Sequence, residues 1–396
     1  MATAMGEELL TVDTVTGYTA KTLSSCKTSP ICKDVSRLRA REIGGGNLNF
    51  AFAVEDDNGG AVFVKQAPDF IKVIPDHRLE SERIKLEHEF YKDLHEVLGQ
   101  PLSAKHLPVM HAFDEERMVM IMEFLGSYEL LQSRLFSGSA DLTIAAALGE
   151  VLGVMHGRTH CSMLDSAEVE RLSKKYENST LKGIQLEFVY SKCFREDARA
   201  AHLREDAGFM AKLEALKAVY RGDDKADLAL LHGDLHAGSI MVDERVGAVK
   251  LIDPEFAVYG PPGLDLGSLL STYALACCFC VVTGSDSSAA EPLLAAVSRL
   301  VESYTATLSR MGAATIVVDR AKELAVGFAG CEIARTALGM AYERSMRIDD
   351  EAVRENAEKR VLEVGARCIR TESREGTEFL MAELRRFAAG AEDIQY

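Results

Sequence analysis

The chain contains 396 residues, which is too long for one small hydrophobic core and predicts a protein with two lobes. Its 61 acidic and 45 basic residues give a formal net charge of −16, which argues against a nucleic acid or an anionic membrane as the partner. Nine cysteines are scattered without paired metal-ligand spacing, and this odd number predicts free thiols in a reducing compartment.

The amino terminus, MATAMGEELLTVD, lacks a basic segment followed by an apolar stretch. We therefore expect no secretory signal, and together with the free thiols this indicates a cytoplasmic protein. The segment from Thr11 to Leu23 is expected to form a short helix in the first lobe.

A glycine-rich segment follows, consisting of Gly44, Gly45, Gly46 and Asn47. Glycines let backbone N–H groups approach a phosphate closely, although a simple turn is the alternative explanation. Two predicted strands, 50–55 and 61–65, flank a turn, and Lys65 ends the second strand. A lysine at this place would reach the α- and β-phosphates of a nucleotide, and it would need an acidic partner to hold it.

The acidic partner is expected on a helix predicted over residues 83–95. We assign Glu87 to this role, with Glu89 as the nearest alternative. The competing explanation for Glu87 is an ordinary solvated helix face.

A mostly apolar strand at 117–122 leads into 123–126, where the connection between the two lobes is expected. Backbone groups of Glu123, Phe124 and Leu125 would hydrogen-bond the edge of an adenine ring. This contact requires no particular side chain, so a plain strand end is equally compatible with the sequence.

Apolar residues at helical spacing predict a mainly helical second lobe. The predicted helices include 142–156, 291–311, 320–344 and 351–367. Gly157 is expected to end the first of these helices. The cluster Cys277, Cys278 and Cys280 lies in the apolar run 269–282, for which we expect a buried helix, because cysteine behaves as a small hydrophobe and the run is shorter than the roughly 20 residues that span a membrane.

The most informative segment is a predicted β-hairpin whose strands are 239–242 and 248–252. Asp234 precedes the first strand, while Asp253 and Glu255 follow the second, so we expect the three carboxylates to converge. Phosphoryl transfer needs one carboxylate to accept the proton of the attacking hydroxyl and others to hold magnesium. Asp234 fits the first role, and Asp253 with Glu255 fits the second because hard oxygen ligands suit Mg²⁺.

Three polar residues near these carboxylates, Asp265, His232 and Ser239, are expected to support them. Asp265 is predicted to cap the helix that follows it. Kinase-like folds, which this pattern resembles, use an aspartate here to brace the catalytic loop through its backbone, and this resemblance implies the same role for Asp265. His232 is predicted to hydrogen-bond the loop backbone, and zinc binding by His232 and His236 is the less favoured alternative. Ser239 is a candidate for contacting a metal-bound water.

Three segments carry a family resemblance: 42–50 (EIGGGNLNF), 232–240 (HGDLHAGSI), and 253–261, which contains DPEFA and YGP. They resemble the S-methyl-5-thioribose kinases within the aminoglycoside-phosphotransferase-like group, where Ser239 replaces the asparagine of most relatives. The resemblance is strong from Arg41 to Gly267 and loose elsewhere. It implies an α+β, protein-kinase-like bilobal fold with an antiparallel sheet in lobe 1–122, a hinge at 123–126 and a mainly helical lobe 127–396.

The resemblance also implies an activity: transfer of the γ-phosphoryl group of ATP, with Mg²⁺, to the 1-hydroxyl of S-methyl-5-thioribose in methionine salvage. It further implies a homodimer. A pair of adjacent arginines near the sugar is matched by Arg335, but Thr336 stands at the second position, and Tyr342 stands where the family has a histidine. The chain also has no tryptophan for the substrate loop of some relatives.

Two alternatives remain at this point. One is a kinase of the same fold that acts on an aminoglycoside, choline, homoserine or another sugar. The other is a catalytically silent nucleotide-binding protein, which the joint presence of Lys65, Asp234, Asp253 and Glu255 disfavours.

Overall fold

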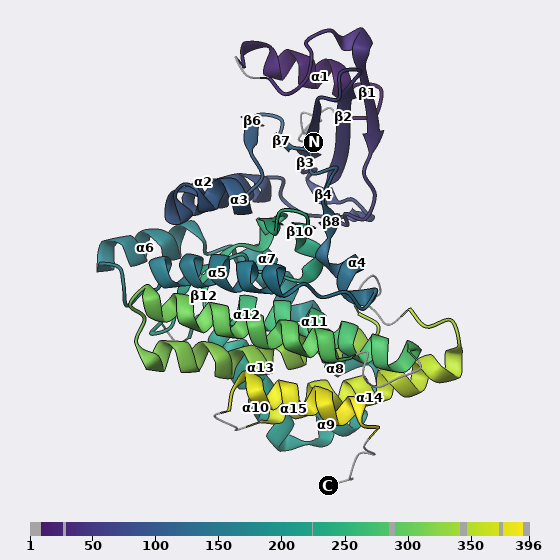
Figure 1. Cartoon of the computed structure of the whole chain (residues 1–396), viewed down its shortest axis with the longest axis vertical. Coiled ribbons are helices and arrows are strands. Elements are labelled where there is room, and N and C mark those ends of the chain that lie inside the picture. Colours follow the sequence, from purple (N-terminus) through teal and green to yellow (C-terminus); the bar gives the residue numbers. More distant parts are fainter. Residues whose placement is uncertain are drawn as a thin grey trace, which may run out of the picture. The chain divides into compact units, whose positions relative to one another are not determined.

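The computed structural model describes residues 9–26, 29–223, 225–284, 290–340, 347–371 and 375–390. The chain divides into two compact units, of which the first comprises 1–96 and 103–128 and the second comprises 97–102 and 129–396. The first unit contains an antiparallel sheet and the second is mainly helical (Figure 1), which confirms the predicted α+β class. The predicted hinge 123–126 lies inside the first unit, at the end of a strand.

The first unit is built on a five-stranded antiparallel sheet in the order β1-β2-β3-β7-β6. Its strands are β1 (Leu38–Glu42), β2 (Phe50–Asp56), β3 (Ala61–Gln66), β6 (Met110–Asp114) and β7 (Val119–Glu123), with a separate pair β4 (Phe70–Ile71) and β5 (Ile74–Arg78). Its helices are α1 (Val15–Thr22), α2 (Arg83–Leu98), whose last two residues belong to the second unit, and α3 (Leu102–His106), whose first residue also belongs to the second unit. The short helix expected near the amino terminus is therefore present as α1.

The two faces of this sheet have different roles. Alternate residues of the central strands, among them Phe52, Val62 and Val119, are buried in one core with residues of α1 such as Val15. Because successive side chains of a strand point to opposite faces, Lys65 lies on the face away from this core. In the register it stands opposite Ala51 of β2 and Met120 of β7.

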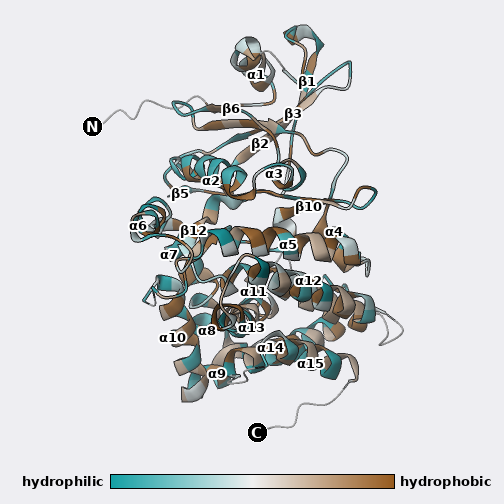
Figure 2. Cartoon of the chain, turned by 60° about the vertical axis from the view of Figure 1, so that its left-hand side comes forward, coloured by the Kyte–Doolittle hydropathy of each residue, from teal (hydrophilic) through white to brown (hydrophobic). Residues whose placement is uncertain are grey.

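The second unit contains short strands and many helices. The strands are β8 (Glu129–Leu130), β9 (Ala229–Leu231), β10 (Ile240–Asp243), β11 (Ala248–Leu251) and β12 (Val258–Gly260). The helices are α4 (Leu131–Phe136), α5 (Leu142–Thr159), α6 (Ser166–Lys175), α7 (Ser179–Phe188), α8 (Lys192–Glu196), α9 (Ala201–Glu205), α10 (Ala207–Arg221), α11 (Gly263–Thr283), α12 (Glu291–Arg310), α13 (Thr315–Ala337), α14 (Glu351–Arg370) and α15 (Thr377–Ala388). Figure 2 shows how their hydropathy varies, from the mostly hydrophilic α6 to the apolar α11.

Helix α11 forms the centre of the second unit. It is long and apolar enough to cross a membrane by composition, but 78% of its most apolar window is buried inside the protein. It packs against α13, α4 and α12 and carries the three clustered cysteines, all buried. Burial raises the pKa of the Cys277 thiol to about 12, which keeps it protonated and poorly nucleophilic. The predicted buried helix is confirmed, although it begins six residues before the predicted run, at Gly263 rather than Leu269.

Closely packed helix pairs hold the second unit together, and glycines make this possible. Gly149, Gly153 and Gly157 follow one face of α5 against α12, and a Cβ at Gly149 would lie 2.3 Å from the carbonyl oxygen of Leu300. Gly330 of α13 and Gly365 of α14 meet in the same way. The prediction that Gly157 ends its helix was wrong, because this glycine lies inside α5 and is needed for contact with α12.

A substitution at this contact tests the close packing. Gly149→Ala places a methyl group against the backbone of α12, and overpacking of this kind costs about 1–3 kcal/mol, more than the roughly 1 kcal/mol that alanine gains in helix propensity. We expect a lower thermal denaturation midpoint by far-UV circular dichroism. Gly183→Ala on α7, where nothing lies within 4 Å of an added Cβ, is the control and should not lower it. A Gly149→Ala protein as stable as the parent would contradict the close contact.

Candidate active site

The glycine-rich segment connects β1 to β2 in the first unit. Gly45 has φ +95°, which favours glycine, and no described atom lies within 4 Å of a Cβ built at Gly44 or Gly45. Asn47 is exposed, and its carbonyl oxygen accepts a hydrogen bond from the Val73 N–H at 3.1 Å. The backbone of this segment is therefore open to close approach by another group.

Arg83 anchors the two residues that follow this segment, and sequence reasoning missed it. This buried residue begins α2, and its Nη2 donates to the Leu48 carbonyl oxygen at 3.1 Å and to Asn49 Oδ1 at 2.9 Å. Its Nη1 donates to the Pro68, Leu79 and Glu80 carbonyl oxygens. A cation in the first turn of a helix opposes the helix dipole, and this was the available signal that Arg83 has another role.

Lys65 and Glu87 form a buried ion pair within the first unit. Lys65 Nζ lies 2.6 Å from Glu87 Oε2, and the two side chains are 7% and 1% exposed. The alternative partner, Glu89, instead contacts Lys92 at 2.7 Å on the surface of α2. Of the two candidates that the sequence left, the structure pairs Glu87 with the lysine.

The strand β7 ends at Glu123, where the hinge was expected to begin. The Glu123 N–H donates to the Val109 carbonyl oxygen at 2.8 Å, and the Leu125 carbonyl oxygen accepts from the Tyr128 N–H at 3.0 Å. Phe124 lies between them, and the guanidinium of Arg41 stands 5.4 Å from the centre of its ring.

In the second unit, the segment around Asp234 lies directly against the segment around Glu255. Gly233 has φ +86°, and a Cβ there would lie 1.9 Å from the Phe256 carbonyl oxygen, so only glycine fits. His232 Nε2 donates to the Ile252 carbonyl oxygen at 2.9 Å, and its Nδ1 accepts from the Asp234 N–H at 3.4 Å. The predicted backbone role of His232 is thereby confirmed.

Asp265 holds the backbone immediately before Asp234. Its buried carboxylate accepts hydrogen bonds from the N–H groups of His232 at 2.7 Å and Gly233 at 2.9 Å. The predicted bracing role is confirmed, but the predicted capping role was wrong, because α11 already begins at Gly263 and the carboxylate points to the loop instead. His156 adds a contact that sequence reasoning missed: its Nε2 lies 3.4 Å from Asp265, and its Nδ1 lies 3.0 Å from the Tyr304 hydroxyl.

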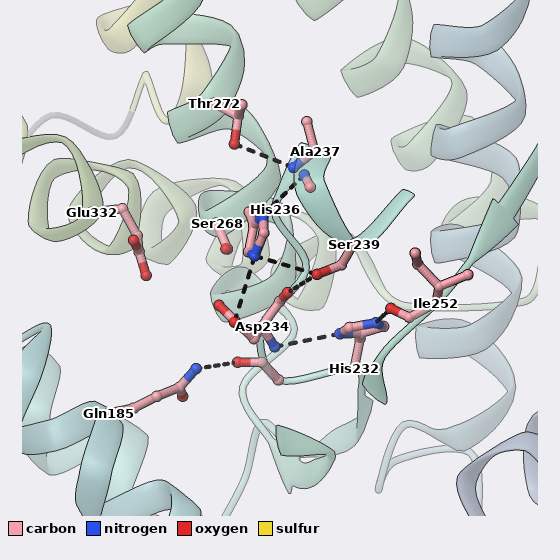
Figure 3. Close-up of polar contacts among 12 residues, drawn as sticks. Gln185, His232, Asp234, His236, Ala237, Ser239, Ile252, Ser268, Thr272 and Glu332 are labelled. Carbon is pink, nitrogen blue, oxygen red and sulfur yellow. Dashed lines mark hydrogen bonds and ion pairs between the residues drawn. The ribbon is translucent and has the colours of Figure 1, made fainter. Parts of the chain in front are cut away.

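Asp234 has polar contacts with His236 and Ser239, which follow it closely in the sequence (Figure 3). His236 Nδ1 accepts from the Gly238 N–H at 2.9 Å, so in a neutral ring the proton is on Nε2, 3.6 Å from Asp234 Oδ2 and 3.3 Å from Ser239 Oγ. Ser239 Oγ donates to the Asp234 carbonyl oxygen at 3.1 Å. Both the backbone and the carboxylate of Asp234 therefore have neighbours that restrict their movement.

The two carboxylates after β11 differ in their surroundings. Asp253 is exposed and has φ 64° and ψ 47°, a strained backbone conformation of the kind that clusters at functional sites. Glu255 is 5% exposed and lies in the 3₁₀ turn Pro254–Phe256. Two carboxylates separated by one residue supply the hard oxygen ligands that a divalent cation needs, so these residues fit such an ion.

Arg335 lies near the end of α13 and is 9% exposed. Its Nε and Nη2 donate to Glu332 Oε2 at 2.8 and 2.7 Å, and the Thr336 hydroxyl donates to the Glu332 carbonyl oxygen at 2.8 Å. Burial opposes the charged form, but the carboxylates of Glu332 and Asp234 outweigh it and keep the pKa of Arg335 above its usual value. The charge of Asp234 is therefore close enough to Arg335 to raise the pKa of its guanidinium. Tyr342 lies outside the described residues.

Residues 39–280 match the model of a family described as the phosphotransferase enzyme family. This match spans more than half of the chain, and the chain belongs to that family. Two methylthioribose kinases are similar to it: one from Bacillus velezensis, 29% identical over 78% of this chain and 80% of that protein, and one from Enterobacter sp., 28% identical over 89% and 94%.

The fold is also similar to that of a solved structure, a choline kinase from Cryptosporidium parvum. The TM-score is 0.52 and the identity 14%, over 89% of this chain and 95% of that one. This likeness shows the fold alone, and it confirms the predicted kinase-like architecture. Membership of the family implies ATP as the phosphoryl donor and, as a rule, a divalent metal ion.

A substitution at Asp265 tests the bracing of the loop. Asp265→Asn removes the charge and turns an NH₂ group toward one of two backbone donors, and an unsatisfied buried donor costs about 1–3 kcal/mol. We expect a lower denaturation midpoint and a kcat lowered far more than nucleotide affinity, measured by steady-state kinetics and by nucleotide titration. Unchanged kcat in a folded Asp265→Asn protein would contradict the bracing role.

Proposed function

We propose that this protein is a methylthioribose kinase, which transfers the γ-phosphoryl group of ATP to the 1-hydroxyl of S-methyl-5-thioribose in methionine salvage. The observation that carries this proposal is the similarity to proteins of that name over most of the chain, together with the family match. The carboxylates and the lysine that such chemistry needs are present in the expected segments.

In this proposal Asp234 accepts or orients the proton of the attacking hydroxyl. Asp253 and Glu255 hold the magnesium ion, which neutralises phosphate charge when bound. Lys65, oriented by Glu87, contacts the α- and β-phosphates, and the backbone of Gly44, Gly45, Gly46 and Asn47 lies along them. The adenine edge contacts the backbone of Glu123, Phe124 and Leu125, and the Leu125 amide is the donor that we assign, because the Glu123 N–H already binds Val109.

Arg335 is the residue that we assign to the sugar. Its side chain is within electrostatic range of Asp234, and two of its donor nitrogens already bind Glu332. Thr336 replaces the second arginine of the family, and its hydroxyl is used within α13. We also propose a cytoplasmic homodimer; the nine free cysteines are consistent with a reducing compartment, and the dimer rests on the family resemblance.

Thr336 favours one second candidate, a kinase of another small hydroxylated substrate, because it changes a position that contacts the sugar in the family. The purified protein with ATP and magnesium should turn over S-methyl-5-thioribose and leave choline, homoserine and aminoglycosides untouched, as measured by ADP release. Turnover of one of the other acceptors in place of the thiosugar would replace the first candidate by the second. Absence of turnover with every acceptor, despite nucleotide binding, would support a silent protein.

Asp234→Asn is the sharpest test of the chemistry. The substitution keeps the size of the side chain but removes its ability to accept a proton, so we expect kcat to fall by about 10²–10⁴-fold while nucleotide affinity is retained. The control is Asp243→Asn, which removes a carboxylate at the end of β10 that pairs with the exposed Arg245 and should leave kcat unchanged. Normal turnover by the Asp234→Asn protein would remove Asp234 from this role.

A further inference from the structure

Helix α7 contacts both catalytic segments of the second unit, and neither contact was visible in the sequence. The residue before the helix, Asn178, bonds the segment of Glu255, and Gln185 within the helix bonds the segment of Asp234. The two residues are seven positions apart, one immediately before α7 and the other within it, so a single helix links the two contacts.

Asn178 has an unusual backbone and an unusual side-chain contact. It adopts φ 42° and ψ 46°, a left-handed conformation that asparagine tolerates better than most residues. It occupies the N-cap position, but its side chain makes no capping hydrogen bond. Its Nδ2 instead donates to the carbonyl oxygens of Glu255 at 3.1 Å and Ala257 at 3.0 Å. Both acceptors are carbonyl groups, so the orientation of the amide is unambiguous.

Gln185 makes the corresponding contact with the other segment. It is buried, and its Nε2 donates to the Gly233 carbonyl oxygen at 2.8 Å (Figure 3). Its Oε1 accepts a hydrogen bond from the hydroxyl of Tyr220 on α10. With both ends of the amide bonded, the side chain holds the carbonyl oxygen immediately before Asp234 in one place.

We propose that α7 sets the spacing between the proposed base and the proposed metal ligands, with Asn178 and Gln185 as positioning residues. This inference rests on the proposed function for the roles of Asp234 and Glu255. Asn178 fixes the backbone on both sides of Phe256 and thereby the direction of the Glu255 carboxylate. Gln185 fixes the peptide that leads into Asp234. The contact of Gly233 with Phe256 brings the two segments together, and α7 limits how far each can rotate about that contact.

Two variants separate these effects from loss of structure. Asn178→Gly retains the freedom for a positive φ and removes only the amide. Gln185→Met keeps the length of the side chain and removes its donor and acceptor. Gly183→Ala is the matched control, because it lies on the same helix, is exposed and has nothing within 4 Å of an added Cβ.

Asn178→Gly and Gln185→Met should change different kinetic parameters. Since loss of a hydrogen bond that orients a metal ligand costs about 10–100-fold in metal affinity or activity, Asn178→Gly should raise the half-saturating magnesium concentration at least about tenfold with the KM of the sugar unchanged. Gln185→Met should lower kcat by a similar factor and leave the magnesium requirement unchanged. Gly183→Ala should equal the parent in both measurements.

A second readout does not depend on turnover. Magnesium with a non-hydrolysable ATP analogue should raise the denaturation midpoint of the parent, and Asn178→Gly should need about tenfold more magnesium for the same shift. An Asn178→Gly protein with parental magnesium dependence in both assays would overturn the proposal, as would equal loss of every parameter in both variants. The thermal assay contains no sugar. A finding that S-methyl-5-thioribose is not the acceptor would therefore contradict the proposed substrate without affecting the test of Asn178.

Discussion

The carboxylate of Asp265 is the contact on which the proposed catalytic loop depends. It accepts two backbone hydrogen bonds in a buried place, and bonds to a charged group contribute about 1.5–3 kcal/mol each. Its own position is set by α11, by His156 and, through His156, by Tyr304 of α12. Tyr304 can reach His156 because glycines let α5 and α12 approach closely. Helix packing at the centre of the second unit thus determines the backbone that presents Asp234.

In the first unit the main constraint is the buried ion pair between Lys65 and Glu87. Removing Lys65 and Glu87 from water costs several kcal/mol for each ion, and a contact of 2.6 Å offsets this cost only while both partners remain. Their burial is therefore better explained by positioning than by stability. Lys65 lies in β3, between β2 and β7, so its backbone is fixed by strands on both sides. Arg83, four residues before Glu87, ties the same helix to Leu48 and Asn49, which directly follow the glycine-rich segment.

Sequence reasoning succeeded where the signal is local. The hairpin around β10 and β11 and the helix that carries Glu87 follow from periodicity and motif order, and the bracing role of Asp265 follows from the resemblance to kinase-like folds. It failed where a residue in or beside a helix has a distant partner: Asn178 and Glu255 are 77 positions apart, and His156 and Asp265 are 109 apart. Gly157 was misread for the same reason, since a glycine at a helix contact and a glycine at a helix end look alike until the neighbouring helix is known.

In the proposed role of Arg335, the charges around its guanidinium would limit which acceptors can bind. Glu332 and Asp234 are two carboxylates acting on one guanidinium, so this cluster carries a net charge of about −1 before any metal or nucleotide is added. An anionic acceptor would be repelled, whereas a neutral polyol can accept hydrogen bonds from the guanidinium and donate to a carboxylate. Thr336 adds no charge to this cluster, and its hydroxyl donates to the Glu332 carbonyl oxygen within α13. In the proposed role of Arg335, the net charge of the cluster would disfavour anionic acceptors relative to neutral ones, and Thr336 removes no donor from Arg335 itself.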